Sequence, residues 1–122
     1  MNLNEKQIET KIKVELFARL FGIEPEWAVS VAYIESSLGL NQRSPTNCRG
    51  VFQMSSIAME DLLIAMPSID DDLIDIVCGI AFLRLLLRRH KTIKKATEHY
   101  CDPADREKYV PRVQELMQEF SK

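Results

Sequence analysis

The stretch VAYIESSLGLNQRSPTNCRGVFQMS, residues 31–55, runs from an apolar helix into a long polar segment. Residues 39–53 contain many turn formers, among them Gly39, Pro45 and Gly50, and this composition predicts a loop. Glu35 stands where the apolar helix ends, although a helix that only packs against a core needs no acid at that position. The sequence on either side indicates what kind of fold surrounds this acid.

Helical periodicity dominates the rest of the chain, and strand signals are weak everywhere. Asn4 and Gln7 have the spacing of a capping box at the start of a first helix, which Gly22 ends. The expected core face of that helix consists of four apolar residues at four-residue spacing, Ile8, Ile12, Leu16 and Leu20. The chain is therefore expected to be all-α.

Five further helices are expected along the chain. One begins at Pro25 and ends near Ser37, and the next is capped by Ser55 or Ser56 and stopped by Pro67. A fourth starts behind the acids 70–72 and is apolar enough to be the central, most buried helix. A short helix at 92–100 and a final amphipathic helix after Pro111 complete a single domain, residues 1–122, of about six helices.

The composition is that of an ordinary globular domain. The chain has 122 residues, of which 46% are hydrophobic and 28% charged, with a formal net charge of −2. This size suits one core, and the absence of a separated basic stripe argues against nucleic-acid binding. The basic stretch at 88–95 is expected to complement the end of a helix dipole.

Cysteine usage gives no sign of a metal or cofactor. The three cysteines, Cys48, Cys78 and Cys101, have no pairwise spacing pattern, which argues against a disulfide framework and a zinc site. Cysteine–histidine catalysis with His90 or His99 has no local signature to support it. Cys78 is expected to pack in the core, and we expect no metal and no cofactor.

The sequence lacks the features of a targeting or membrane segment. Its N-terminal stretch has no short apolar core with a small-residue cleavage site, as a signal peptide has. The longest apolar run, IVCGIAFL at 76–83, is too short to span a bilayer. We therefore expect synthesis in a reducing cytoplasm without a signal peptide and no membrane insertion.

Glu35 has two features that predict an elevated pKa. Its apolar neighbours disfavour the charged form, and so does the negative end of the helix dipole. A carboxylic acid that stays protonated near neutral pH suits glycosidic cleavage, because the leaving oxygen must receive a proton. The alternative is a solvated glutamate at a helix end with no chemical role.

Glu35-Ser36, followed by SPTNCRGVFQM at 44–54, resembles the catalytic core of the lysozyme-like soluble lytic transglycosylase family. That family has a Glu-Ser pair and then Ser-x-x-Gly-Ala-x-Gly, two hydrophobic residues and Gln. The loop positions fall in order on Ser44, Asn47, Cys48, Gly50, Val51, Phe52 and Gln53. Asn47 replaces the usual Gly, and because Asn tolerates positive φ better than other non-glycine residues, the turn is expected to survive.

A second block of the family pattern follows in the same order. It is carried by Gly79 with Phe82-Leu83, by Ala96 with Tyr100, and by Tyr109-Val110. Cys101 replaces the family's Asn after the tyrosine, and the Gly that should follow is missing. The resemblance covers roughly residues 25–113, and it implies a lysozyme-like domain around a central apolar helix, with a glycan-binding cleft.

The resemblance implies cleavage of the β-1,4 bond between N-acetylmuramic acid and N-acetylglucosamine in peptidoglycan. Glu35 would be the catalytic general acid and then the base, while the muramic 6-hydroxyl closes onto C1 to leave a 1,6-anhydro end. Hydrolases instead need a second carboxylate, and residues 38–56 contain no Asp or Glu.

Four other residues are expected to contact substrate. Gln53 would offer its amide to a sugar N-acetyl group or to Glu35, and Ser44 would hold the Glu35 rotamer. Tyr100 would hydrogen-bond near Glu35 or stack on a sugar, and Met54 would line the cleft. The alternatives are an ordinary polar residue for Gln53, a turn residue for Ser44 and core packing for Tyr100 and Met54.

Peptidoglycan lies outside the membrane, whereas the sequence shows no export signal. A bacteriophage origin resolves this conflict, because such enzymes travel in a virion, with other virion proteins as partners, or are released through membrane lesions. Two rival functions stay open: a lysozyme-type muramidase with an unidentified second acid, and a non-catalytic helical module that binds glycan or builds a virion.

Overall fold

The structure is a computed structural model, and it describes residues 1–41, 50–53 and 72–122. These residues form five α-helices and one 3-10 helix, with no strand among them. The elements are α1 (Glu5–Leu20), α2 (Pro25–Ser36), α4 (Asp72–His90), α5 (Ile93–Tyr100), η1 (Pro103–Asp105) and α6 (Arg106–Phe120). The all-α prediction is therefore confirmed for the described part. The helix expected between Ser55 and Pro67 lies outside it.

Helix α1 begins as its sequence predicts. The Gln7 backbone N–H donates to Asn4 Oδ1, and the Asn4 backbone N–H donates to Gln7 Oε1, both at 2.9 Å. The helix ends at Leu20, and Gly22 follows with a φ of 72°, a conformation that glycine adopts without strain. The capping box and the terminating glycine are both confirmed.

The predicted core face of α1 is wrong. The side that faces the core carries Gln7, Thr10, Val14 and Ala18, and Ile8, Ile12, Leu16 and Leu20 are exposed. Phe17 and Phe21 also pack against the core, so α1 has apolar residues on two opposite sides. Periodicity alone could not choose between them.

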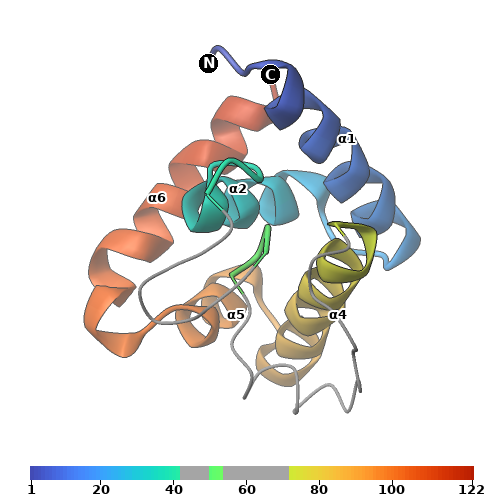
Figure 1. Cartoon of the computed structure of the whole chain (residues 1–122). Helices are drawn as coiled ribbons and strands as arrows, with labels where there is room; N and C mark the ends of the chain where they lie inside the picture. Colours follow the sequence, from blue (N-terminus) through green and yellow to red (C-terminus); the bar gives the residue numbers. More distant parts are fainter. Residues whose placement is uncertain (42–49, 54–71) are drawn as a thin grey trace.

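Among the described residues, the helix at the centre is α2 instead of α4. Figure 1 shows α2 in the middle of the molecule, with α1 and α6 beside it and α4 and α5 on the remaining side. Seven of its 12 residues are buried. Trp27 is fully buried there, and its Nε1–H donates to Thr97 Oγ1 of α5 at 2.9 Å. The length and apolar character of α4 suggested the central place, but a short helix with neighbours on several sides buries more of its surface.

The last helix begins earlier than predicted. Helix α6 starts at Arg106, directly after η1, and Pro111 lies inside it. Because proline has no N–H, the helix loses one backbone hydrogen bond there and nevertheless continues. Val113 and Leu116 are buried, as the amphipathic pattern predicts. The fifth predicted helix is confirmed, with Thr92 as the N-cap of α5.

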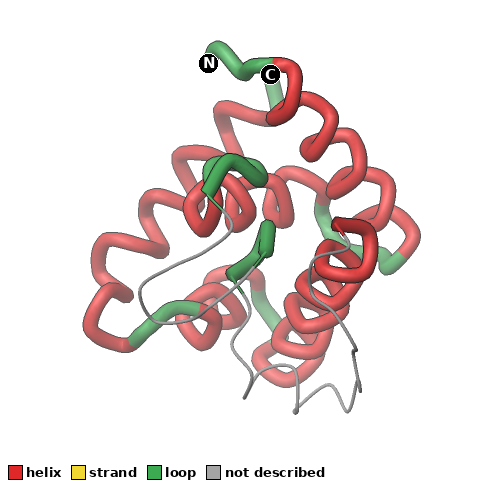
Figure 2. Tube along the Cα trace, viewed as in Figure 1, coloured by secondary structure: helices red, strands yellow, loops and turns green. Residues whose placement is uncertain are grey.

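The described segment 50–53 lies among the helices. Figure 2 shows it as a short loop between α2, α4 and α5. Val51 and Phe52 are buried in the core cluster. The end of α2 and this segment are thus neighbours, although they are separated along the chain.

Candidate functional site around Glu35

Glu35 occupies the last turn of α2, where the chain reverses direction. Three successive residues after the helix have positive φ: Ser37 at 52°, Leu38 at 55° and Gly39 at 90°. The Ser37 N–H donates to Tyr33 O at 2.8 Å and closes the final turn. A left-handed run of this kind ends a helix abruptly, so Glu35 is held one residue before the end of a rigid element.

The carboxyl group of Glu35 contacts a tyrosine from the far end of the chain. The hydroxyl of Tyr109, on α6, donates to Glu35 Oε2 at 2.5 Å. Glu35 is half-buried, and burial raises its pKa above the ordinary value, while the Tyr109 hydrogen bond acts in the opposite direction. The direction agrees with the expectation from the sequence, and a freely solvated glutamate does not fit this environment.

Tyr109 is held in its neutral, donating form. Burial, and next the nearby charge of Glu35, raise the pKa of the Tyr109 phenol well above its usual range. The hydroxyl therefore keeps its proton across the physiological pH range. A carboxyl oxygen that accepts from a phenol leaves the other oxygen as the place for an exchangeable proton, and such a group can act as a general acid.

Ser36 ties the same turn of α2 to the segment 50–53. Its Oγ donates to Val51 O at 2.6 Å and accepts from the Gly39 N–H at 2.9 Å. Both the hydroxyl and its partners are buried, so each bond replaces one that water would otherwise make. Glu35 and Ser36 are neighbours in sequence, yet one contacts α6 and the other contacts residues 50–53.

Asp75 of α4 holds the other side of this segment. Its side chain is buried, and Oδ2 accepts the Val51 N–H at 2.5 Å. Gly50 has a φ of 87° and lies against the Asp75 carboxylate, so that a Cβ at position 50 would clash with it. Gly79 plays a similar part, because a Cβ there would clash with the Phe52 ring. The two glycines thus let a backbone and a ring come close to α4.

The predicted substrate residues have different outcomes. Tyr100 lies near the site, where its hydroxyl donates to Phe52 O at 2.5 Å and its ring packs at 5.8 Å from that of Phe82. The Gln53 side chain donates to Gly50 O at 2.7 Å and to Asn41 O at 3.4 Å. Ser44 and Met54 lie outside the described residues, as do Asn47 and Cys48.

Two site residues were missed by the sequence reasoning. Tyr109 belonged to the family-like block at the chain's end, but nothing local connected it with Glu35. Asp75 follows the acids 70–72 and was indistinguishable from a residue that complements a helix N-terminus. Its position inside an otherwise apolar run of α4 is the signal that could have indicated a buried acid with a structural partner.

Cysteine chemistry finds no support among the described cysteines. Cys78 is buried in the core as predicted, and burial raises the pKa of its thiol. Burial also raises the pKa of Cys101. His90 and His99 stack on each other, with ring centroids 3.7 Å apart. Neutral thiols are poor nucleophiles, so a cysteine–histidine pair is disfavoured here.

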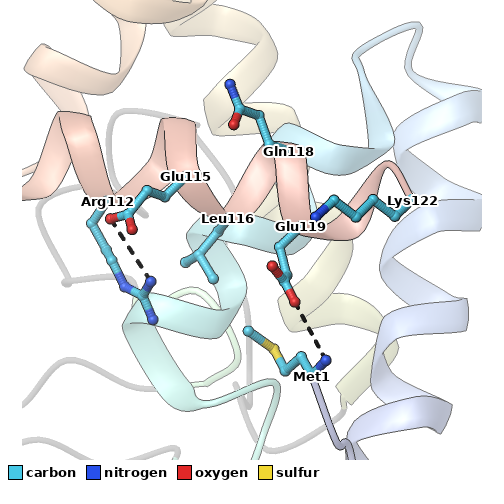
Figure 3. A pocket seen from close by; sticks show the side chains of 7 residues that line it. All are labelled: Met1, Arg112, Glu115, Leu116, Gln118, Glu119 and Lys122. Atoms are coloured by element: carbon cyan, nitrogen blue, oxygen red, sulfur yellow. Dashed lines mark hydrogen bonds and ion pairs between the residues drawn. The ribbon is translucent and has the colours of Figure 1, made fainter.

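A separate hollow lies where the two ends of the chain meet. Figure 3 shows it against α6, lined by Met1, Arg112, Glu115, Leu116, Gln118, Glu119 and Lys122, with a volume of about 220 Å³. The Met1 amino group pairs with Glu119 at 3.3 Å, and Arg112 lies 4.0 Å from Glu115. These two ion pairs lie within the lining, and Glu35 is not part of it.

The described residues show neither a metal cluster nor a membrane helix. Across 1–41, 50–53 and 72–122, no group of three or more His, Cys, Asp or Glu side chains could hold a metal ion. In the same residues no helix is both long enough and apolar enough to cross a membrane. Comparisons with protein-family models, with curated proteins and with solved structures found no match to the chain.

Proposed function

We propose that the protein is a peptidoglycan lytic transglycosylase in which Glu35 is the general acid and base. The observation that carries the proposal is the half-buried Glu35 carboxyl, its pKa raised by burial and one oxygen fixed by the Tyr109 hydroxyl. The family-like order of residues from Glu35 to Tyr109 supplies the reaction: cleavage between N-acetylmuramic acid and N-acetylglucosamine.

In the first step protonated Glu35 gives its proton to the glycosidic oxygen as the bond from that oxygen to C1 breaks. The carboxylate that forms is stabilised by the Tyr109 hydrogen bond, because a phenol donates more strongly to an anion than to a neutral acid. In the second step the carboxylate takes the proton of the muramic 6-hydroxyl, whose oxygen bonds to C1. Glu35 is protonated again, and the product is a 1,6-anhydro end.

The choice of an intramolecular nucleophile rests on the acids available. A retaining or inverting glycosidase needs a second carboxylate at roughly 5–10 Å from the first. Residues 38–56 contain none, and Asp75 accepts a backbone N–H of the segment beside Glu35. In this proposal Asp75 supports the segment 50–53 and takes no part in proton transfer.

The glycan strand is proposed to lie over the end of α2 and the segment 50–53, in a lysozyme-like cleft. Tyr100 would contact a sugar through its ring, and Gln53 would contact an N-acetyl group. Ser44 and Met54 would complete the contacts. The enzyme is proposed to reach the cell wall as a virion component or as a phage enzyme released during lysis.

The test is mass spectrometry of the soluble products from purified peptidoglycan. The natural protein and Glu35→Gln are compared with Glu24→Gln, which removes an exposed carboxylate at the opposite end of the same helix. Muropeptides one water lighter than hydrolytic products, present with Glu24→Gln and absent with Glu35→Gln, would support the proposal. Hydrolytic products would indicate a muramidase, and no products on several wall types would favour a non-catalytic module.

A further inference from the structure

The outer side of α1 carries a continuous apolar stripe. Ile8, Ile12, Leu16 and Leu20 are 46%, 59%, 52% and 70% exposed. Single exposed leucines are ordinary, but four at successive i, i+4 positions form one ridge along the whole helix. The opposite side of α1 already faces the core, so the fold itself does not need these residues.

Four pairs of residues, on the stripe and beside it, lie symmetrically about Val14. Ile8 and Leu20 lie equally far from it, as do Ile12 and Leu16. The same relation joins Glu9 with Arg19 and Lys13 with Glu15, and in each of these pairs the charges are opposite. Equal spacing makes the apolar part of this relation automatic, so the evidence for pairing lies in the two pairs of opposite charge beside the stripe.

Symmetry of this kind is what an antiparallel pair of identical helices requires. When two copies of α1 cross at Val14, each residue meets its mirror position on the other copy. Apolar residues then meet apolar residues, and Glu9 meets Arg19 of the second copy. A parallel pair would place Glu9 beside Glu9 and Arg19 beside Arg19, so the charges select the antiparallel arrangement.

The ends of the stripe also fit each other in shape. An open hollow of about 530 Å³ adjoins the N-terminal end of α1, lined by Met1, Asn2, Leu3, Ile8, Lys11 and Ile12. In the antiparallel arrangement the most exposed member of the stripe, Leu20 of the second copy, enters this hollow. Two i, i+4 ridges pack side by side when their helices are inclined by about 50°, the commonest class of helix packing in globular proteins.

We propose that the protein forms a two-fold symmetric dimer through antiparallel contact of its α1 helices. Each copy would cover apolar surface on the order of 400 Å², as large as the main apolar patch of a typical monomer. The total of roughly 800 Å² is smaller than a stable specific interface and has the size of a weak, transient one. We therefore expect a weak dimer, with a dissociation constant on the order of micromolar. This pairing is independent of the proposed function.

Sedimentation velocity over a range of protein concentrations tests the pairing. The natural chain should shift from monomer to dimer between roughly 1 and 100 µM. Leu16→Glu should abolish the dimer, since it places two carboxylates inside the apolar contact. Circular dichroism checks that each variant stays folded, which is expected because all the substituted side chains are exposed.

Charge exchange provides the sharper test of geometry. Glu9→Arg or Arg19→Glu alone should weaken dimerisation about tenfold, because each creates two like-charge contacts. The double variant Glu9→Arg with Arg19→Glu should restore it, whereas Lys6→Glu, which changes net charge equally on α1 but away from the stripe, should have little effect. A natural chain that stays monomeric at several hundred micromolar, or a double variant that is not restored, would overturn the proposal.

Discussion

The hydrogen bond between Tyr109 and Glu35 makes a quantitative prediction for Tyr109→Phe. The phenol donates to Glu35 Oε2 at 2.5 Å and favours the carboxylate, in opposition to the burial that favours the acid. Removing the hydroxyl leaves burial unopposed, so the pKa of Glu35 should rise further. The consequence can be measured as a change in stability with pH, without any substrate.

The direction in which stability changes with pH follows from proton binding in the folded and unfolded states. Because the pKa of Glu35 is raised in the folded protein, the folded state holds this proton more tightly than the unfolded state. The stability that Glu35 contributes is therefore complete below its ordinary pKa and declines as pH rises through the raised one. In Tyr109→Phe the decline should continue to higher pH and become deeper.

The size comes from the difference between two kinds of hydrogen bond. A bond to a neutral group contributes about 1 kcal/mol and one to a charged group about 1.5–3 kcal/mol. Tyr109→Phe should thus cost about 1 kcal/mol at pH 4 and about 1–2 kcal/mol more at pH 8, with the lower value favoured because Glu35 is only half-buried. Urea titrations followed by fluorescence of the buried Trp27 would measure both.

Two comparisons isolate the effect. In a Glu35→Gln background the pH-dependent part should vanish, because no carboxyl group remains to titrate. Tyr33→Phe makes the same chemical change on α2, where the ring packs edge-on against Phe120, and should give a cost independent of pH. A Tyr109→Phe cost that is constant from pH 4 to pH 8, or that shrinks as pH rises, would refute the reasoning.

Three further predictions concern the surrounding structure. Ser36→Ala should cost about 2–3 kcal/mol in urea unfolding, because it removes two buried hydrogen bonds, to Val51 O and from the Gly39 N–H. Ser37→Ala, outside this network, should cost much less. Gly79→Ala should destabilise by about 1–3 kcal/mol through its clash with the Phe52 ring, and a further Phe52→Leu should recover part of the loss in the same assay. The pKa of His90 is lowered by partial desolvation and then by the nearby His99. The free energy of unfolding should therefore fall as pH drops below about 6.5, the ordinary pKa of histidine, because the unfolded chain binds the proton more readily. His99→Gln should lessen this fall, as measured by thermal melts between about pH 5 and 8.

The local signals of this chain were reliable where a residue acts through its immediate neighbours. The Asn4–Gln7 capping box and the start of α2 at Pro25 both follow from contacts within one turn. The face of α1 did not follow, because that helix is apolar on two sides and only its neighbours decide which is buried. Pro111 was likewise misjudged, since η1 begins the helical path before the proline is reached.

The residues of the candidate site also differ in whether local sequence could identify them. Glu35 could be found from sequence because its apolar surroundings and its place at a helix end are local properties. Its partner could not, since Tyr109 is 74 positions away and meets it only through the packing of α6 on α2. Nor could Asp75, whose burial depends on the approach of residues 50–53 to α4.

Two adjacent residues in the last turn of α2 have different roles: Glu35 is the candidate acid, and Ser36 binds the segment 50–53. Consecutive helical side chains point about 100° apart, so Glu35 and Ser36 necessarily face different neighbours. Glu35 meets Tyr109 of α6, while Ser36 binds Val51, which Asp75 holds from the other side. A shift of the segment 50–53 would therefore act on the turn that carries the acid, and changes in Ser36 or Asp75 should alter the Glu35 environment without touching it. Positioning of the carboxyl group thus depends on three elements at once, and a glutamate that served only as a surface charge would need none of them.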